Sequence, residues 1–323
     1  MSPLVGGLIA LLVTTALTPV AIRIARRAGI VDRPGALKVQ EVPVAYLGGV
    51  AVLAGLLAGL LGRVGTGPLL VPLVLATLLG LADDLLDLDA RLRLACEVAI
   101  GVVAAFLVPA GPGVLGHVVT AAAVVGLLNA VNLLDGLDGL AGGVGAVAAL
   151  GFALVGPGPR PLALALAGAL AGFLVFNRPP ARIYLGDAGA YLVGTALALL
   201  CATSLDATPS AATWAGLPLL VAIPVTDTAV AIVRRRLAGR PLFAGDRSHL
   251  YDQLVDRGAS RTAAVGRMVA AQVVLTSLGV AAVHLPGPLA WTVLLVSAGI
   301  LAVLVVGRGF LTPDGPSPEG LHP

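Results

Sequence analysis

Carboxylates and amides stand at regular spacing in one short segment, residues 129–141, of a chain that is otherwise strongly apolar. Asn129, Asn132, Asp135 and Asp138 follow one another at intervals of three residues, and glycines end the run. A step of three keeps side chains near one face of a helix, and Asn or Asp at a membrane edge is costly and tends to be functional. Such groups can bind the base and sugar of a nucleotide. Two helix caps flanking a turn are the structural alternative.

A second acidic cluster begins with the adjacent residues Asp83 and Asp84. Neighbouring carboxylates repel each other and take up protons unless a cation lies between them, and oxygen-rich clusters suit Mg²⁺ or Mn²⁺. Asp87 is one helical turn away, so we expect it on the same face. An Asp-Asp pair is a weak motif by itself, and metal or phosphate binding is only one interpretation of it.

Two further segments place an aromatic ring or a cation beside polar groups. Asn177 is followed by Tyr184 and Asp187, which stand three positions apart. An aromatic residue at the membrane interface is the alternative interpretation of Tyr184. Lys38, the only lysine of the chain, is a compact cation suited to a phosphate, although a basic residue is also typical of any cytoplasmic loop of a membrane protein.

Asp227 and the loop around His249 complete the candidate residues. Asp227 stands three residues after Pro224 and seven before Arg234, so in a straight helix it lies roughly 10 Å inside the membrane edge. A break at the proline would open a polar pocket there. Arg247 and His249 lie in the longest basic loop, where a solvated histidine is the alternative to a ligand-binding one.

The elements that must position these residues are membrane-spanning helices. The chain of 323 residues is 58% hydrophobic and 11% charged, against about 45–50% and 25% in soluble proteins, which excludes a single soluble domain, a coiled coil or a disordered chain. We expect an all-α, polytopic integral membrane protein of about 11 transmembrane helices, with one domain over residues 1–308 and a disordered tail over 309–323. The apolar runs are 4–22, 46–62, 68–82, 94–110, 114–131, 140–156, 161–176, 188–204, 213–233, 263–283 and 289–307.

The arginines set the expected orientation. With the N-terminus outside, all basic residues but Arg63 and Arg160 fall on the cytoplasmic side, as the positive-inside rule requires. This accounts for the net charge of +3 without a nucleic-acid partner. The acidic residues also gather inside, Asp206 excepted. We therefore expect a multi-pass protein of the plasma membrane with its site and C-terminus on the cytoplasmic face.

These motifs, taken in order over residues 31–258, resemble those of the polyprenyl-phosphate N-acetylhexosamine-1-phosphate transferases, the MraY/WecA-like glycosyltransferase 4 family, and the layout is closer to the WecA-like branch. The resemblance implies an enzyme that transfers a sugar 1-phosphate from a UDP-N-acetylhexosamine to a polyprenyl phosphate in the bilayer, with Mg²⁺ or Mn²⁺, and releases UMP. UDP-GlcNAc is the expected donor, and whether the chain is a monomer or a homodimer stays open.

The resemblance also implies a role for each candidate residue. Asp83, Asp84, Asp187 and Asp227 would be catalytic, and Asp84 and Asp187 would hold the metal. Tyr184 would stack on uracil, Lys38 would meet the phosphates, and His249 would mark the donor-sugar loop. The residues that would bind the nucleotide sugar are Lys38, Asn129, Asn132, Asp135, Asp138, Asn177, Tyr184, Arg247 and His249.

The chain departs from the family pattern where the donor sugar would lie. Leu250, Tyr251 and Asp252 follow His249, where relatives often continue with further histidines, and Ala190 replaces a usual serine. We expect Tyr251 and Asp252 to alter the pattern of contacts to the sugar. A transferase for UDP-MurNAc-pentapeptide is the alternative within the family, and a membrane transporter or a structural membrane protein lies outside it. Transporters need polar groups through the whole membrane depth, whereas here they gather at one side.

Overall fold

The computed structural model is almost entirely helical and describes residues 1–323 except 33–42, 64, 112, 206–208, 242–247 and 313–323. Two short strands, β1 (Val31–Asp32) and β2 (Val44–Ala45), pair antiparallel. The helices are α1 (Pro3–Ala28), α2 (Gly48–Leu60), α3 (Gly67–Leu86), α4 (Ala90–Leu107), α5 (Gly113–Leu134), α6 (Leu140–Val155), α7 (Arg160–Asn177), α8 (Gly186–Ser204), α9 (Ala211–Leu220), α10 (Ala222–Leu237), α11 (Leu250–Asp256), α12 (Arg261–Val283) and α13 (Gly287–Gly307).

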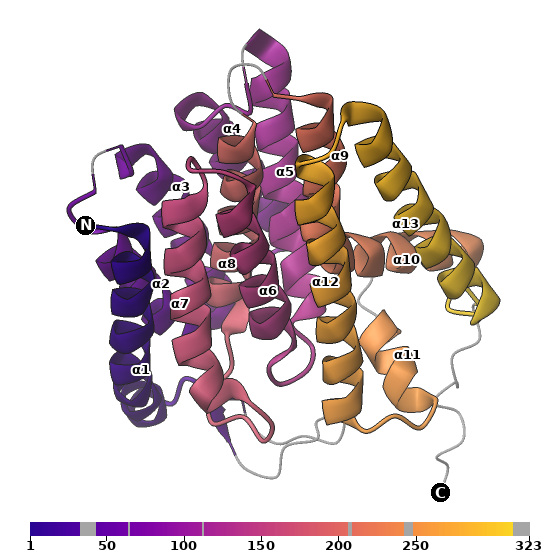
Figure 1. Cartoon of the computed structure of the whole chain (residues 1–323). Helices are drawn as coiled ribbons and strands as arrows, with labels where there is room; N and C mark the ends of the chain where they lie inside the picture. The colour runs from indigo at the N-terminus through magenta and orange to yellow at the C-terminus, as the bar shows by residue number, and fades with distance from the viewer. Residues whose placement is uncertain (33–42, 64, 112, 206–208, 242–247, 313–323) are drawn as a thin grey trace, which may run out of the picture.

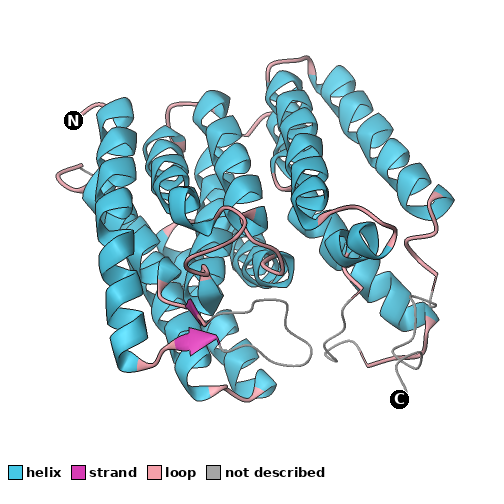
Figure 2. Cartoon of the chain, turned by 90° about the horizontal axis from the view of Figure 1, so that it is seen from below, coloured by secondary structure: helices cyan, strands magenta, loops and turns pink. Residues whose placement is uncertain are grey.

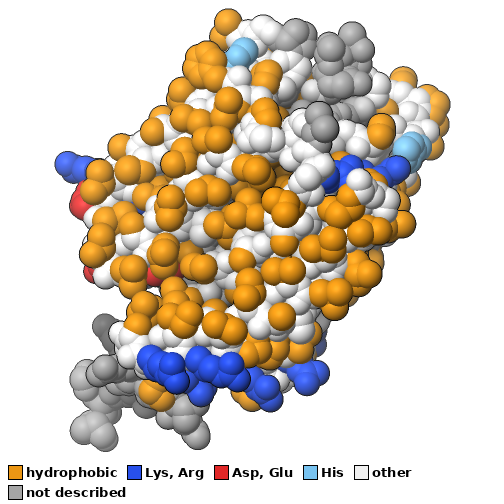
Figure 3. Space-filling model, turned by 90° about the vertical axis from the view of Figure 1, so that its left-hand side faces the viewer, with side chains coloured by type: hydrophobic (Ala, Val, Ile, Leu, Met, Phe, Trp, Pro, Cys, Tyr) orange, Lys and Arg blue, Asp and Glu red, His pale blue; other side chains and the backbone are white. Residues whose placement is uncertain are grey.

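The helices confirm an all-α membrane protein. Within the described ranges, seven helices are long and apolar enough to cross a membrane, and the bent pair α9–α10 makes an eighth if it is one span. Each apolar run of the sequence is helical, but α2 and α6 are shorter than a full crossing, so the count of about 11 spans stays a prediction. Figure 3 shows a flank covered by hydrophobic side chains, with basic side chains in a row at its lower edge.

Helix α8 forms the centre of the bundle, since 83% of its apolar window is buried. It packs on α3 and α5, while α1, α2 and α7 pack together on one side and α9, α12 and α13 on the other (Figure 1). Helices α3 and α8 approach closely because Gly80 has no side chain: a Cβ there would lie 2.3 Å from the Asp187 carbonyl oxygen. This contact places the acidic end of α3 against the start of α8.

The strand pair ties the first loop to the start of α8. Ala45 of β2 forms a parallel bridge with Ile183, and the Tyr184 N–H donates to the Ala45 carbonyl at 2.8 Å. Figure 2, looking from below, shows the strands among the helix ends. The strand β2 and the segment that carries Tyr184 therefore meet at the start of α8.

The ninth apolar run is not one straight helix, which corrects the expected position of Asp227. Helices α9 and α10 are bent by 72° at Val221, three residues before Pro224. Helix α10 runs across the bundle (Figure 1), so an estimate of depth that assumes a straight helix does not apply to Asp227.

The side chain of Gln272 satisfies the backbone at this break. Its Oε1 accepts from the Ile223 N–H at 3.1 Å, and its Nε2 donates to the Leu220 carbonyl at 2.9 Å and to Thr276 Oγ1 at 2.8 Å. Gln272 is fully buried, and in an apolar environment a backbone group without a partner is costly. One amide from α12 therefore stabilises the bend that turns α10 toward the site.

The chain after α13 continues as a turn to Thr312. Phe310 and Leu311 pack against a cluster of buried residues, called the second hydrophobic core below, which includes Leu134, Leu250 and Met268. This part of the expected tail is therefore structured. Residues 313–323 lie outside the described residues, and the single domain over 1–308 stays a prediction.

Replacing Gln272 with Leu should lower the free energy of unfolding by about 1–3 kcal/mol, because buried backbone groups at the break lose their partners. Thermal unfolding of the purified protein in detergent measures the effect. Ser277→Ala is the control, since that exposed hydroxyl bonds only within its own helix. Equal stability of the two variants would contradict this account of the bend.

Candidate active site

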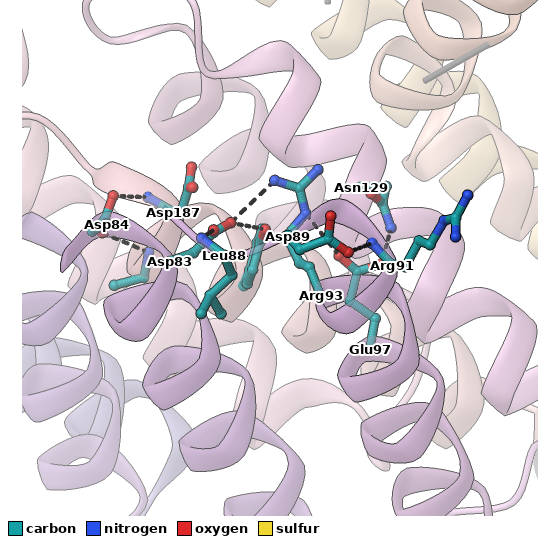
Figure 4. A network of polar contacts seen from close by, with 11 residues as sticks. Asp83, Asp84, Leu88, Asp89, Arg91, Arg93, Glu97, Asn129 and Asp187 are labelled. Atoms are coloured by element: carbon teal, nitrogen blue, oxygen red, sulfur yellow. Dashed lines mark hydrogen bonds and ion pairs between the residues drawn. The ribbon is translucent and has the colours of Figure 1, made fainter. Parts of the chain in front are cut away.

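The start of α8 is held by a carboxylate from α3. Asp84 accepts from the backbone N–H groups of Asp187 at 3.0 Å and Ala188 at 3.1 Å, one on each oxygen. Free N–H groups and the positive end of the helix dipole favour a negative charge at this position. The bond brings Asp83, Asp84 and Asp187 side by side (Figure 4), so the structure joins two of the predicted motifs.

Gly186 permits this contact. Its φ is +71°, a conformation that favours glycine, and a Cβ there would lie 2.8 Å from Asp84 Oδ2 and 2.9 Å from the Tyr46 carbonyl oxygen. Glycine at position 186 is therefore required by the backbone, whereas Asp187 contributes only its backbone N–H to this contact.

Asp83 belongs to a buried polar network. Its Oδ1 accepts from the Leu88 N–H at 3.1 Å, and its Oδ2 accepts from Tyr191 Oη at 2.8 Å and pairs with Arg93 Nη1 at 3.2 Å. Both oxygens are thus occupied. This places Asp83 as a group that holds Arg93 and the turn after α3, rather than as a free acid.

The network extends along α4 to the Asn129 amide. Arg93 Nε lies 3.7 Å from Glu97 Oε1, and Asn129 Nδ2 donates to Glu97 Oε2 at 2.6 Å (Figure 4). Glu97 is only 1% exposed. Arg93 and Glu97 are not among the residues predicted from the sequence, although a cation and an acid one turn apart on an apolar helix are a usable signal. The Asn129 Nδ2 atom is engaged in this network, and binding of the nucleotide sugar by Asn129 stays a prediction.

Asp87 does not share a face with the Asp pair, which corrects that expectation. It is the left-handed C-cap of α3, with φ +50°, and its side chain is exposed. The helix ends before its next turn, so the spacing rule for neighbours on one face does not reach Asp87.

Asp135 follows α5 directly and faces the other carboxylates. Burial first, and then the negative charges of Asp187, Asp84 and Asp138, raise the pKa of Asp135 well above its usual range. The four carboxylates come from three separate parts of the chain. Their mutual repulsion is the electrostatic condition that a cation would relieve.

These carboxylates fit a magnesium ion that is completed by a substrate. Within the part of the chain that the structure describes, no three His, Cys, Asp or Glu side chains form a complete metal-binding group. Mg²⁺ is usually held by one or two carboxylates together with substrate phosphates and water, and such a site needs no third side chain. Asp187 and Asp135 are the two carboxylates that best suit such a site, and Asp84 lies beside them.

Asp138 and Asn177 connect the loops around the cluster. Asp138 Oδ2 accepts from the Ala181 N–H at 2.9 Å. Asn177 Oδ1 accepts from the Gly139 N–H and its Nδ2 donates to the Ile183 carbonyl, both at 2.9 Å. Asn177 is buried. Both residues therefore position the loops, whereas Asn132 is half-buried at the end of α5.

Tyr184 lies on the loop that leads into α8. Its ring packs edge-to-face on Tyr46, with the centroids 6.0 Å apart. Burial, and then the negative charges of Asp138 and Asp32, raise the pKa of Tyr184 to about 12, so the phenol is neutral at pH 7. The ring is half-buried beside the acidic cluster, as a platform for a planar group requires.

Asp227 holds the start of α11. Its Oδ2 lies 2.7 Å from His249 Nδ1, and its Oδ1 accepts from the Leu250 N–H at 2.7 Å. Asp227 is fully buried and His249 is 4% exposed. The structure thus brings together two residues that were predicted separately, and it fixes which ring nitrogen of His249 faces the carboxylate.

Tyr251 and Asp252 have partners within the protein, and their effect on the contacts to a sugar stays a prediction. The Tyr251 ring stacks on His249 at 5.6 Å, and its hydroxyl donates to the Leu133 carbonyl at 3.1 Å. A Cβ at Gly136 would lie 2.1 Å from that hydroxyl. Asp252 accepts from the His249 N–H as part of a capping box. Lys38 and Arg247 lie outside the described residues.

The chain is similar in sequence to known transferases of one family. A family model described as "Glycosyl transferase family 4" matches residues 67–205. The chain is 30% identical to the decaprenyl-phosphate N-acetylglucosaminephosphotransferase of Mycobacterium tuberculosis, over 79% of this chain and 76% of the relative. It is 27% identical to a probable undecaprenyl-phosphate N-acetylglucosaminyl 1-phosphate transferase of Bacillus subtilis, over 81% and 79%. It is 28% identical to the corresponding Escherichia coli O157:H7 transferase, over 92% and 88%.

Mg²⁺ should raise the thermal stability of the purified protein more at pH 8 than at pH 5. Because the pKa of Asp135 is raised, its neutral form stabilises the fold at low pH, and this contribution is lost as the pH rises through the raised pKa. Ionised carboxylates then repel one another, and a bound cation at about ten times its Kd restores roughly 1.4 kcal/mol.

The variant Asp135→Asn should reduce this difference between the two pH values, and Asp256→Asn, which removes an exposed acid, is the control. A Mg²⁺ effect of the same size at both pH values would contradict the cation site.

Proposed function

The chain belongs to glycosyl transferase family 4, and from this premise we propose that it transfers N-acetylglucosamine 1-phosphate from UDP-GlcNAc to a polyprenyl phosphate, releasing UMP. The three relatives above agree in the acceptor class and in the transferred group that their names state. The observation that carries the proposal is the carboxylate cluster of Asp84, Asp135 and Asp187 at the end of an apolar bundle.

The acidic cluster is proposed to receive the diphosphate of the donor. Both substrates are anions, so four carboxylates would repel them unless a cation intervened. Asp187, with Asp84 and Asp135 beside it, would hold Mg²⁺, which would neutralise the pyrophosphate when bound. Catalysis in such a transfer is mainly positioning and charge stabilisation.

The polar network behind the cluster keeps these residues in place. Asp84 spends both oxygens on the start of α8, which fixes the Asp187 backbone. Asp83 holds Arg93, whose side chain is 32% exposed, and thus keeps a positive charge at the edge of the acidic cluster. Asp83 is therefore a positioning residue in the proposal.

The nucleotide and the sugar would lie on opposite sides of the diphosphate. Tyr184 offers a neutral ring face for uracil, and Asn132 offers an amide. His249, fixed by Asp227, can bond with its other ring nitrogen to a sugar hydroxyl, the acetamide or the β-phosphate. A phosphate oxygen of the lipid attacks the β-phosphorus, the bond from that phosphorus to the UMP oxygen breaks, and UMP leaves.

The apolar flank of the bundle suits a bilayer, and the polyprenyl tail would remain in it. We propose that the site lies on the cytoplasmic face of the plasma membrane. The positive-inside rule assigns the loops that are rich in arginine to that side, and UDP-sugars are soluble substrates. No observation favours a transporter, since the polar residues of the described site lie at one end of the helices.

UMP release from membranes supplied with undecaprenyl phosphate and a panel of UDP-sugars tests the proposal. UDP-GlcNAc should be the fastest donor, faster than UDP-MurNAc-pentapeptide, and EDTA should abolish the reaction. Asp187→Asn should lower kcat at least ~10²-fold, as expected for loss of an electrostatic contact in the transition state. Asp256→Asn serves as the matched control. Full activity of the Asp187 variant would refute its assignment as a metal ligand. If none of the UDP-sugars yields UMP, the proposed function is wrong.

Tyr184→Ala should weaken UDP-sugar binding by about 1–3 kcal/mol, the usual range for stacking of a base on an aromatic ring. Tyr184→Phe keeps the ring and should bind nearly normally. Inhibition by UMP measures both variants. If Ala and Phe weaken inhibition equally, the ring does not support the base.

A further inference from the structure

We propose that the turn after α13, residues 308–311, is a clamp that positions His249 for the donor sugar, with Gln253 and Arg257 as its positioning residues. The inference rests on the proposed function for its chemistry but on separate contacts for its geometry. Gln253 and Arg257 bond to the turn after α13 and to each other, and neither is among the predicted site residues.

Helix α11 needs support from outside. It has only seven residues, and a helix of that length is unstable by itself because nucleation is costly. His249 stands directly before it, where its ring stacks on Tyr251 and binds Asp227. Any movement of α11 therefore moves the ring of His249.

Gln253 joins the residue before His249 to the turn after α13. Its Nε2 donates to the Ser248 carbonyl at 2.9 Å and to the Phe310 carbonyl at 3.1 Å. Gln253 is buried, and Ser248 is the residue before His249. One side-chain amide thus links the backbone of the donor loop to the backbone of the C-terminal turn.

Arg257 fixes the same turn from the end of α11. It donates to the Arg308 carbonyl at 2.6 Å, to the Gly309 carbonyl at 3.1 Å and to Gln253 Oε1 at 3.0 Å. Its guanidinium lies 4.1 Å from the centroid of the Phe310 ring. Carbonyl bonds and a cation–π contact combine in one planar group, which lysine cannot reproduce.

Apolar contacts complete the clamp. Phe310 and Leu311 pack against the second hydrophobic core, to which Leu250 and Tyr251 of α11 also belong. This core also contains Leu134 and Leu137, from the segment that carries Asp135. The turn after α13 therefore supports His249 and α11 and, through Tyr251, the segment after α5.

The test compares chains truncated after Thr312 and after Gly307, together with Phe310→Ala, Phe310→Trp and Arg257→Gln. Arg267→Gln, which removes an exposed arginine of α12, is the matched control. Truncation after Gly307, Phe310→Ala and Arg257→Gln should each raise KM for UDP-GlcNAc by at least about 3–10-fold, the size expected for loss of a partly exposed cation–π contact. The kcat and the KM for undecaprenyl phosphate should change little, and Phe310→Trp and truncation after Thr312 should behave as the full chain.

Hydrogen exchange of the α11 amides gives a second readout that does not need activity. Exchange should be faster in the chain that ends at Gly307 than in the chain that ends at Thr312. If the full chain releases no UMP but α11 shows this difference, the proposed function fails and the clamp stands. Unchanged exchange together with an unchanged KM, or parallel loss of kcat, KM and thermal stability in Phe310→Ala, would overturn the clamp as a positioning device.

Discussion

The bond between the Asp84 carboxylate and the first N–H groups of α8 is the constraint on which the site depends. It joins the end of one helix to the start of the most buried helix in the bundle. A helix start in an apolar environment must satisfy its N–H groups, and a carboxylate does so while complementing the helix dipole. The same bond places Asp187 and the neighbouring acids close together. Asp84 therefore stabilises the start of α8 and also fixes the position of Asp187 in the acidic cluster.

A concentration of negative charge has to be offset elsewhere. Arg93 does this for Asp83, and Glu97 with Asn129 continues the network into α4. The carboxylates farther along, Asp135 and Asp187, keep their repulsion. Paired charges thus hold the framework, whereas the carboxylates that repel one another would be stabilised by a cation, as the proposed function requires.

The apolar runs and the family motifs predicted the helices and the end of the bundle where the site lies. Individual side chains were harder to assign, because spacing along one segment does not show what another segment supplies. Asp83, Asp138 and Asn177 stay predicted site residues, and the structure adds bonds that the sequence did not predict. Asp83 binds the Tyr191 and Arg93 side chains, and Asp138 and Asn177 bind the backbone of neighbouring loops. Asp227 and His249 were separate candidates, and only the 72° bend before α10 brings them together. The assumption of a straight helix therefore does not predict the contact between Asp227 and His249.

The bend links the stability of the bundle to the position of His249. Gln272 satisfies the backbone at the break, α10 then carries Asp227 across the bundle, and Asp227 fixes His249. On the other side Tyr251 reaches the Leu133 carbonyl, next to the segment with Asp135. His249 is thus held between two chains of contacts, one from the broken span and one from the acidic loop. Both supports of His249 thus come from the helices of the bundle, through Asp227 of α10 and the Leu133 carbonyl of α5.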